Sequence, residues 1–288
     1  MPSARSNRLG LDVLDNWALL TRAERDAAYN NAAAVADSTR LTAEREAASA
    51  KLRASVRCVL DVAYGPRERN RFDLFPAADP AAPCLLFIHG GYWQRNSRDM
   101  FSAVVEGVLA HGWSAALPGY TLAPDATLTE IVAEITSALG WLAREGGPRG
   151  IAGPLVVSGW SAGGHLTALA LAHPRVHAGL AISGIFELAP LRDTYLNDKL
   201  RLTEDEAEQL SPLRLPVVRK PLAIAYGSRE LPALVYNSRA FHAQRSAAHA
   251  PGPLLPIANA DHFTILDELR KPDGQLTAAA LALATRRF

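Results

Sequence analysis

The sequence feature that most constrains the fold is a series of short apolar runs that alternate with longer helix-like stretches from Pro83 onward. Each run is apolar along nearly its whole length, which is typical of strands that are buried on both faces. Parallel strands joined by helices form right-handed βαβ units, whose helices cover both sides of the sheet. The pattern therefore predicts an α/β fold with a mostly parallel sheet. The runs are CLLFIHG, SAALPGY, PLVVSGW, AGLAISG, PLAIAYG and LLPIAN.

Two further strands are expected before this series, in VRCVLDVAYG and NRFDLFPA, joined by a turn around Gly65 and Pro66. They suit an antiparallel edge, and they bring the predicted sheet to about eight strands. Residues 11–54 are rich in Ala, Arg and Glu and have apolar positions at helical spacing, which predicts a helical N-terminal extension. A chain of 288 residues with 49% hydrophobic content can build one sizeable core, so we expect residues 1–288 to form a single domain.

An acidic stretch between two predicted strands is the candidate for a small cap. Residues 202–216, LTEDEAEQLSPLRLP, have helical spacing and are bounded by prolines, and they form the end of a longer insertion at 187–216. Ligands of α/β sheets bind beyond the carboxyl ends of the strands, where a surface insertion can cover them. We therefore expect residues 187–216 to cap the site.

Charge and cysteine content indicate which classes of binding partner and which cellular compartment to expect. Thirty basic and 29 acidic residues give a formal net charge of +1, which leaves no electrostatic footprint for nucleic acid and no polybasic membrane anchor. Cys58 and Cys84 each border an apolar run, which indicates buried free thiols in the cytoplasm. We find no signal-peptide region and no stretch near the roughly 20 apolar residues that span a bilayer. A small-molecule substrate is the expected partner, and a homodimer is left open.

The strongest chemical motif is GWSAGG at residues 159–164, between the predicted strand PLVVS and a helical run. This is the G-x-S-x-G pattern of a nucleophile on a tight strand-to-helix turn, where small residues on either side let the neighbouring backbone pass. The strand before the motif and the helix after it supply the context that the bare pattern lacks. Ser161 is therefore the candidate nucleophile.

A serine hydroxyl needs a base to act as a nucleophile at neutral pH, and the base needs a carboxylate that orients it. His262 follows the last predicted strand, and Glu230 follows the strand before it. The chain order of serine, acid and histidine is the order that accompanies this strand–serine–helix motif. Glu230 is the preferred acid because it lies at a strand end, while Glu187 and Asp261 are the alternative carboxylates.

The glycine pair in FIHGGYW indicates an oxyanion hole. Acyl transfer builds negative charge on the carbonyl oxygen, and backbone N–H groups are the usual means of stabilising that charge. One donor is expected at Ala162, directly after the nucleophile, and others at Gly91 and Tyr92 in the loop after the third strand. These three N–H groups form the predicted oxyanion hole.

Candidates for substrate contact lie beside these donors, and they are Gly90, Tyr92, Trp93 and Trp160. The rings of Tyr92 and Trp93 are expected at the mouth of the site, where flat faces can hold a planar substrate by stacking. Packing beneath the loop is the alternative for Trp93, and burial behind the serine is the alternative for Trp160.

Two histidines beside the motifs are expected to be structural rather than catalytic. His89 precedes the glycine turn, where it would act as a structural partner of the loop. His165 lies four residues past the serine, where it would pack on the helix or cap it.

Together these residues resemble the kynurenine formamidase (arylformamidase) branch of the α/β-hydrolase superfamily. HGGYWQ is the marker of the branch, because the wider esterase and lipase family usually has a third glycine after HGG. The likeness covers most of residues 27–270. Further segments that resemble formamidases are AAYNNAAAV, LPGYTLAPDATLTEIVAEI, SGIFELAPL, LNDKLRLTEDEAEQLSP, YGSRELPALVYNSRAFH and DHFTIL.

The resemblance implies an α/β-hydrolase fold and a serine triad without metal or cofactor, which hydrolyses N-formylkynurenine to kynurenine and formate in tryptophan catabolism. The family positions carry over to Ser161, to His262 and to the loop from Gly90 to Trp93. Two residues depart from the family. Its acid is typically aspartate where this chain has Glu230, and the residue before its nucleophile is commonly histidine, whereas this chain has tryptophan.

The expected function is therefore that of a serine hydrolase that cleaves an aryl formamide, with N-formylkynurenine as the first candidate, through an acyl-enzyme. A carboxylesterase, or a hydrolase of another aryl amide or carbamate, would share the same machinery. The alternative from a different class is a non-catalytic binding protein with the same fold. The complete set of Ser161, Glu230 and His262 argues against that alternative.

Overall fold

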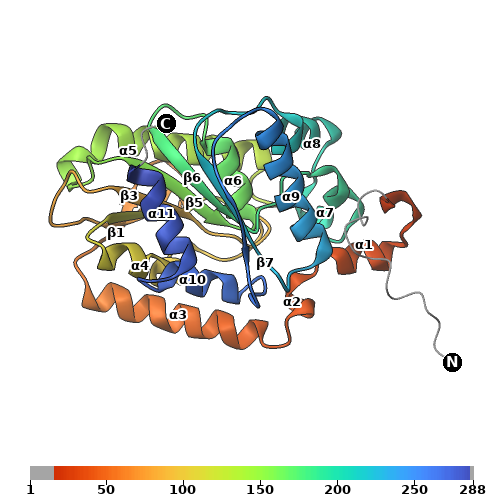
Figure 1. Cartoon of the computed structure of the whole chain (residues 1–288), viewed down its shortest axis with the longest axis horizontal. Coiled ribbons are helices and arrows are strands. Elements are labelled where there is room, and N and C mark those ends of the chain that lie inside the picture. The colour runs from red at the N-terminus through yellow and green to blue at the C-terminus, as the bar shows by residue number, and fades with distance from the viewer. Residues whose placement is uncertain (1–15, 286–288) are drawn as a thin grey trace.

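The computed structural model describes residues 16–285, so residues 11–15 of the predicted extension lie outside the described residues. Eight strands form one sheet in the order β1-β2-β4-β3-β5-β6-β7-β8, with helices on both faces (Figure 1). β2 is antiparallel to β1 and β4, and every other neighbouring pair is parallel. The α/β fold and its antiparallel edge are thus confirmed. The strands are β1 (Val59–Ala63), β2 (Arg71–Phe75), β3 (Cys84–Ile88), β4 (Ser114–Pro118), β5 (Leu155–Trp160), β6 (Val176–Ile182), β7 (Leu222–Gly227) and β8 (Leu254–Ile257).

The helices cover the sheet in two layers, and alternate strand residues reach opposite layers. In β5, Leu155 and Val157 pack with side chains of α5, α6 and α9, whereas Val156 packs with those of α4, α10 and α11. This burial on both faces explains why the strand runs are apolar along their whole length. The helices are α1 (Arg22–Ala28), α2 (Asn31–Ala34), α3 (Ser38–Ser55), α4 (Glu106–Ala110), α5 (Leu128–Glu145), α6 (Ala162–Ala170), α7 (Asn197–Leu200), α8 (Glu204–Leu210), α9 (Pro232–Ala247), α10 (Asp267–Arg270) and α11 (Gln275–Thr285).

Short 3₁₀ helices join several of these elements. They are η1 (Trp17–Leu19), η2 (Arg98–Val105), η3 (Gly147–Arg149), η4 (Ala189–Asp193), η5 (Pro212–Arg214) and η6 (Thr264–Leu266). The longest, η2, lies between β3 and β4 and carries the N-terminal extension on its surface.

The N-terminal extension is helical over its described part, and α3 is anchored on η2. The Ser49 hydroxyl donates to the carbonyl of Met100 (3.0 Å), and the Arg53 guanidinium donates to the hydroxyl of Ser102 (3.1 Å). Leu52 is buried between these two contacts. In Figure 1, α3 is the long orange helix below α10, and side chains of both helices line one groove. The second half of α3 is therefore fixed to the fold.

Residues 187–216 form a helical segment between β6 and β7, with η4, α7, α8 and η5 in sequence. α8 begins with a capping box in which Thr203 and Glu206 satisfy each other's backbone N–H groups. Glu206 also accepts from the N–H of Thr129 in the first turn of α5 (3.1 Å). The acidic stretch is therefore helical, as predicted, and it packs against α5.

The structure bears on two sequence expectations, the absence of a membrane-spanning helix and the burial of both cysteines. Within residues 16–285, none of the helices has the length and apolar content to cross a bilayer. Both cysteines are free thiols, with Cys84 buried in β3 and Cys58 half-buried just before β1. Cys58 is thus more open than predicted.

Candidate active site

The carboxyl ends of the parallel strands bring the predicted catalytic groups to one edge of the sheet. Gly90 follows β3, Ser161 follows β5, Glu230 follows β7 and His262 follows β8. These strands and β6 are parallel neighbours, so their carboxyl ends lie side by side. Residues that are far apart in the sequence therefore meet along this edge.

Ser161 has the backbone conformation of a nucleophile turn. β5 ends at Trp160 and α6 begins at Ala162, and the serine between them has φ 58° and ψ −118°. That conformation is unfavourable for a residue with a side chain, so the surrounding structure must enforce it. The Ser161 N–H donates to the carbonyl of Ile182 in β6 (2.8 Å), and its carbonyl accepts from the N–H of His165 in α6 (3.1 Å). The strand and the helix thus fix the serine at the sheet edge.

His262 and Glu230 form a buried hydrogen-bonded pair. Nδ1 of His262 lies 3.0 Å from Oε2 of Glu230. As a carboxylate, Glu230 only accepts hydrogen bonds, so Nδ1 carries the proton and Nε2 of the neutral ring is the basic nitrogen. The other carboxylate oxygen accepts from the hydroxyl of Ser183 and from the N–H of Gly227 (2.8 Å). Glu230 is therefore held on both oxygens and orients the imidazole.

The two alternative acids have other partners. Glu187 forms an ion pair with Arg214 (3.0 Å), and Asp261 closes a turn by accepting from the N–H of Phe263 (2.8 Å). Neither of these carboxylates bonds to His262 in the described part of the chain. The structure thus places glutamate, rather than the aspartate typical of the family, against the histidine.

The loop after β3 approaches the serine closely because Gly90 has no side chain. A Cβ atom built on Gly90 would lie 2.5 Å from the carbonyl oxygen of Trp160 and 3.0 Å from Cβ of Ser161. Gly91 has φ 118°, a value that favours glycine, and Tyr92 has φ 51°. The two glycines therefore let the backbone turn sharply next to the serine.

Three backbone N–H groups at this turn are free to bind an anion. In residues 16–285, the N–H groups of Gly91, Tyr92 and Ala162 donate to no other group. Ala162 is the first residue of α6, and the N-terminal end of a helix attracts negative charge. The N–H groups predicted for the oxyanion hole are thus unpaired in the region around Ser161.

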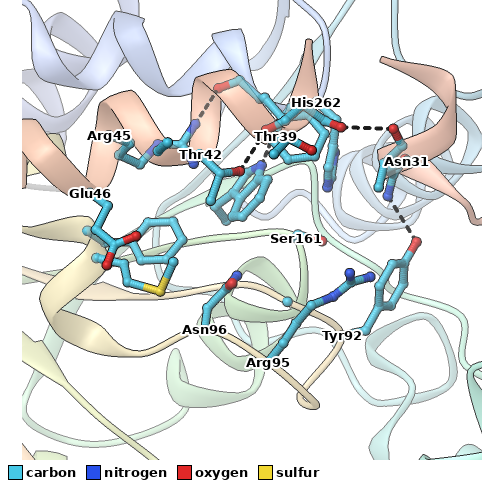
Figure 2. A pocket seen from close by; sticks show the side chains of 18 residues that line it. Asn31, Thr39, Thr42, Arg45, Glu46, Tyr92, Arg95, Asn96, Ser161 and His262 are labelled. Atoms are coloured by element: carbon cyan, nitrogen blue, oxygen red, sulfur yellow. Dashed lines mark hydrogen bonds between the residues drawn. The ribbon is translucent and has the colours of Figure 1, made fainter. Parts of the chain in front are cut away.

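Ser161 and His262 line a cavity of about 400 Å³, here called the active-site cavity (Figure 2). The strand-end loops form one wall. α2 and the first half of α3 form the other, which includes Asn31, Thr42 and Arg45. No residue of 187–216 lines the cavity, so the predicted cap is wrong in its position. α8 packs on α5 instead, and the N-terminal extension covers the site.

The predicted substrate contacts divide into two pairs. Tyr92 and Trp160 line the active-site cavity, whereas Gly90 and Trp93 do not. Trp93 is fully buried, and its ring meets the ring of His165 edge-on at 5.0 Å between centroids. Of the two sequence expectations for Trp93, packing beneath the loop is therefore confirmed, and a place at the mouth of the site is wrong. The sharp turn after the glycines directs its side chain into the core, and Gly90 provides space rather than contact.

Trp160 lines the active-site cavity and also contacts His262. Its indole N–H donates to the carbonyl of His262 (2.7 Å), and its ring centroid lies 4.8 Å from that of the imidazole. The residue that replaces the family's histidine thus faces the cavity and holds His262 in place. Burial behind the serine, the alternative expected from the sequence, does not describe it.

Three charged side chains line the active-site cavity without forming an ion pair in the described part of the chain, although the Arg45 guanidinium donates to the carbonyl of Phe263 (3.1 Å). Arg45, Glu46 and Arg95 line it, and none of them forms an ion pair within residues 16–285. The Arg45 guanidinium lies over the rings of Phe101 (5.5 Å) and Trp160 (5.6 Å). Burial lowers the pKa of Arg45 to about 10, so the side chain stays charged at neutral pH. Sequence reasoning missed Arg45 because a lone arginine in a helical stretch belongs to no motif.

The two histidines expected to be structural are confirmed as such. His89 stacks on Tyr120 at 4.3 Å, and Nε2 of His165 donates to the carbonyl of Leu210 (2.8 Å). Burial lowers the pKa of each histidine to about 4, so both are neutral at physiological pH. In the part of the chain that the structure describes, no group of His, Cys, Asp or Glu side chains is arranged to hold a metal ion.

Comparisons with known proteins relate the chain to formamidases and esterases. Residues 73–180 match the BD-FAE family model. Kynurenine formamidase of Danio rerio is 25% identical over 249 residues, which are 81% of this chain and 84% of that protein. Esterase LipC of Mycobacterium tuberculosis is 26% identical over 260 residues, which are 77% of this chain and 63% of LipC. A solved structure from Silicibacter sp. TM1040, provisionally named a thioesterase, is 30% identical with a TM-score of 0.80, and the match covers 90% of this chain and 99% of that one.

Proposed function

Because the chain belongs to the kynurenine formamidase-like α/β-hydrolases, which are serine hydrolases, we propose that it cleaves an aryl formamide and that N-formylkynurenine is its natural substrate. The observation that carries the proposal is the Glu230–His262 pair, whose histidine lines the same cavity as Ser161. This arrangement supplies a nucleophile, a base and an orienting acid. A non-catalytic binding role is not supported, since the family is one of hydrolases.

In the proposed reaction, the Ser161 hydroxyl attacks the formyl carbon while Nε2 of His262 takes its proton. Glu230 stabilises the imidazolium that forms. The negative charge on the formyl oxygen is stabilised by the N–H groups of the predicted oxyanion hole. His262 then gives the proton to the aryl nitrogen, so that the C–N bond breaks and the amine leaves with the formyl group still on Ser161.

The second half of the reaction releases formate. His262 takes a proton from water as the water oxygen attacks the formyl ester on Ser161. The tetrahedral intermediate again places its negative charge in the oxyanion hole. Its collapse breaks the bond to Oγ of Ser161, which recovers its proton from His262, and formate leaves.

The walls of the active-site cavity support an aromatic substrate that bears a carboxylate. The rings of Phe101, Trp160 and Phe263 line it and offer flat apolar surface to an aryl group. Arg45 and Arg95 also line it and lack a carboxylate partner in residues 16–285. N-formylkynurenine combines an aryl formamide with an amino-acid carboxylate, so it suits both features.

The first test compares kcat/KM for N-formylkynurenine, p-nitrophenyl acetate and p-nitrophenyl butyrate. We expect a strong preference for the formamide and a loss of at least about 10⁴-fold in Ser161→Ala. Ser55→Ala, in an exposed serine at the far end of α3, is the matched control and should leave all three rates unchanged. Turnover of the esters without turnover of the formamide would contradict the substrate assignment while keeping the mechanism.

A carboxylesterase is the second candidate, and the similarity to esterase LipC favours it. The same groups would cleave an ester by the same steps. The two functions differ in the acyl group that the cavity accepts, because a pocket shaped for formyl should reject longer chains. An increase in kcat/KM from acetate to butyrate would therefore favour the esterase.

A further inference from the structure

Asn31 is a buried polar residue in the wall of the active-site cavity. It is the first residue of α2 and is 4% exposed. Its Nδ2 donates to the hydroxyl of Tyr92 (2.9 Å), and that hydroxyl donates to the backbone carbonyl of Tyr29 (2.6 Å). Figure 2 shows Asn31 above Tyr92, with the bond between them dashed. A chain of hydrogen bonds thus joins the N-terminal extension to the loop after β3.

These hydrogen bonds fix the direction of the Asn31 amide. The Tyr92 hydroxyl has one proton, and the carbonyl of Tyr29 can only accept it. The hydroxyl must therefore accept from Asn31, so the amide nitrogen faces Tyr92 and the amide oxygen Oδ1 is left over. Within residues 16–285, this buried Oδ1 has no hydrogen-bond partner. Because buried acceptors are normally paired, Asn31 is a residue of the cavity wall with an acceptor oxygen that lacks a donor.

We propose that Oδ1 of Asn31 accepts a hydrogen bond from an N–H group of the substrate, and that Asn31 thereby makes the site prefer amides to esters. The inference rests on the proposed function. A secondary amide has an N–H group at the position where an ester has an oxygen with lone pairs only. An ester would leave Oδ1 unpaired, and a site built around a hydrogen bond rejects the analogue that lacks the donor.

Two N–H donors of N-formylkynurenine have the required chemistry. One is the N–H of the scissile anilide, and the other is the α-ammonium group. Formanilide and phenyl formate form a pair that differs only in the atom next to the formyl carbon, so this pair isolates the anilide N–H. N-formylkynurenine and its analogue without the amino group form a second pair that isolates the ammonium.

The experiment measures kcat/KM for both substrate pairs with the wild type and with Asn31→Ala. If Oδ1 binds the anilide N–H, the formanilide to phenyl formate ratio falls about tenfold in the variant. If it binds the ammonium, the ratio within the second pair falls by a similar factor while the first ratio is unchanged. If neither ratio changes while the wild type cleaves formanilide, the inference is overturned and the proposed function stands. A wild type that cleaves phenyl formate but no formamide overturns both.

Two further variants separate substrate binding from support of the loop. Asn31→Asp keeps the acceptor oxygen but loses the N–H group that donates to Tyr92, so it should retain the amide preference that Asn31→Ala loses even if both rates fall. Tyr92→Phe removes the hydroxyl but leaves Oδ1 available, so the ratio should stay within about threefold of wild type even if both rates fall. If Tyr92→Phe reproduces the ratio of Asn31→Ala, then Asn31 acts only by holding Tyr92, and the inference is overturned.

Discussion

The two walls of the active-site cavity are built in different ways. The strand-end wall carries Ser161 and His262, with Glu230 behind His262, and each of these is fixed by hydrogen bonds to the sheet or to one another. On the helical wall, Arg45 and Glu46 form no ion pair within residues 16–285, and Oδ1 of Asn31 has no hydrogen-bond partner there. The three triad side chains are thus held in place without a ligand, whereas polar side chains of the helical wall have bonding capacity that a ligand could use.

This difference separates chemistry from recognition. Groups that must keep one geometry during a reaction lie at the ends of buried strands, where the surrounding backbone leaves little freedom. Asn31 and Arg45, which are proposed to bind polar groups of the substrate, come from α2 and the first half of α3, while the anchors of α3 on η2 lie in its second half. We therefore expect changes on the strand-end wall to affect every substrate, and changes on the helical wall to affect particular substrates.

The largest effect is expected from Glu230→Gln on the strand-end wall. The amide keeps the shape of the carboxylate but favours the wrong tautomer of His262, so kcat should fall about 10³–10⁴-fold on formamide and ester alike. Glu187→Gln is the matched control, because Glu187 is also a carboxylate just after a strand but pairs with Arg214. A comparable loss in the control, or a loss confined to one substrate, would contradict the prediction.

An intermediate effect is expected when acid lowers the free energy of unfolding through the two buried histidines, His89 and His165. His89 and His165 are held neutral, since burial lowers the pKa of each to about 4, while unfolded histidine titrates near pH 6.5. As pH falls from about 6.5 to 4, His89 and His165 become protonated in the unfolded chain but stay neutral in the folded chain. The free energy of unfolding should therefore be highest above that range and drop by on the order of 3 kcal/mol for each histidine at pH 4.

Urea unfolding curves at pH 7.5, 6, 5 and 4 measure this loss. His165→Gln removes one of the two titrating groups, so its stability should depend less steeply on pH than that of the wild type, whatever its stability at pH 7.5. His111→Gln is the control, because His111 is an exposed histidine outside the cavity. Equal slopes for wild type and His165→Gln would show that the buried histidines do not control acid stability.

The smallest effect is expected from Arg45→Met on the helical wall. Loss of this cation, which has no carboxylate partner in residues 16–285, should lower kcat/KM for N-formylkynurenine about tenfold, mainly through KM. Formanilide has no carboxylate, so its kcat/KM should be nearly unchanged. Arg40→Met is the matched control on the same helix, since Arg40 is exposed and paired with Asp37 and Glu44. An equal loss on both substrates would mean that Arg45 supports the fold of the site rather than the substrate.

The sequence was sufficient to predict the strand-end wall. A buried parallel strand forces its following residue to the carboxyl edge, so strand ends identified Ser161, Glu230 and His262 once the runs were recognised. The rule that strand ends lie at one edge does not predict whether a side chain in the following turn points into the cavity or into the core. Sequence alone therefore leaves two places for Trp93, at the mouth of the site or beneath the loop, and the reversal after Gly91 buries it beneath the loop.

The helical wall could not be predicted in the same way. Both α3 and α8 have the polar composition of surface helices, and which of them covers a cavity depends on tertiary contacts that leave no local pattern. The position of residues 202–216 between two strands favours a cap, yet α8 packs on α5. Asn31 and Arg45 carried no signal, since single polar residues in a helical stretch are usually solvated.

The hydrogen bonds that join Tyr92 to α2 have a consequence for transplanting specificity between relatives. Residues 22–55 precede the sheet and carry the recognition groups, so they look like a part that could be exchanged as a block. However, the Tyr92 hydroxyl donates a hydrogen bond to the backbone carbonyl of Tyr29 and accepts one from the side-chain amide of Asn31. A graft without a hydrogen-bond donor in place of the Asn31 side chain would remove one partner of this buried hydroxyl next to the oxyanion loop. Tyr92 would therefore have to travel with the transplanted block.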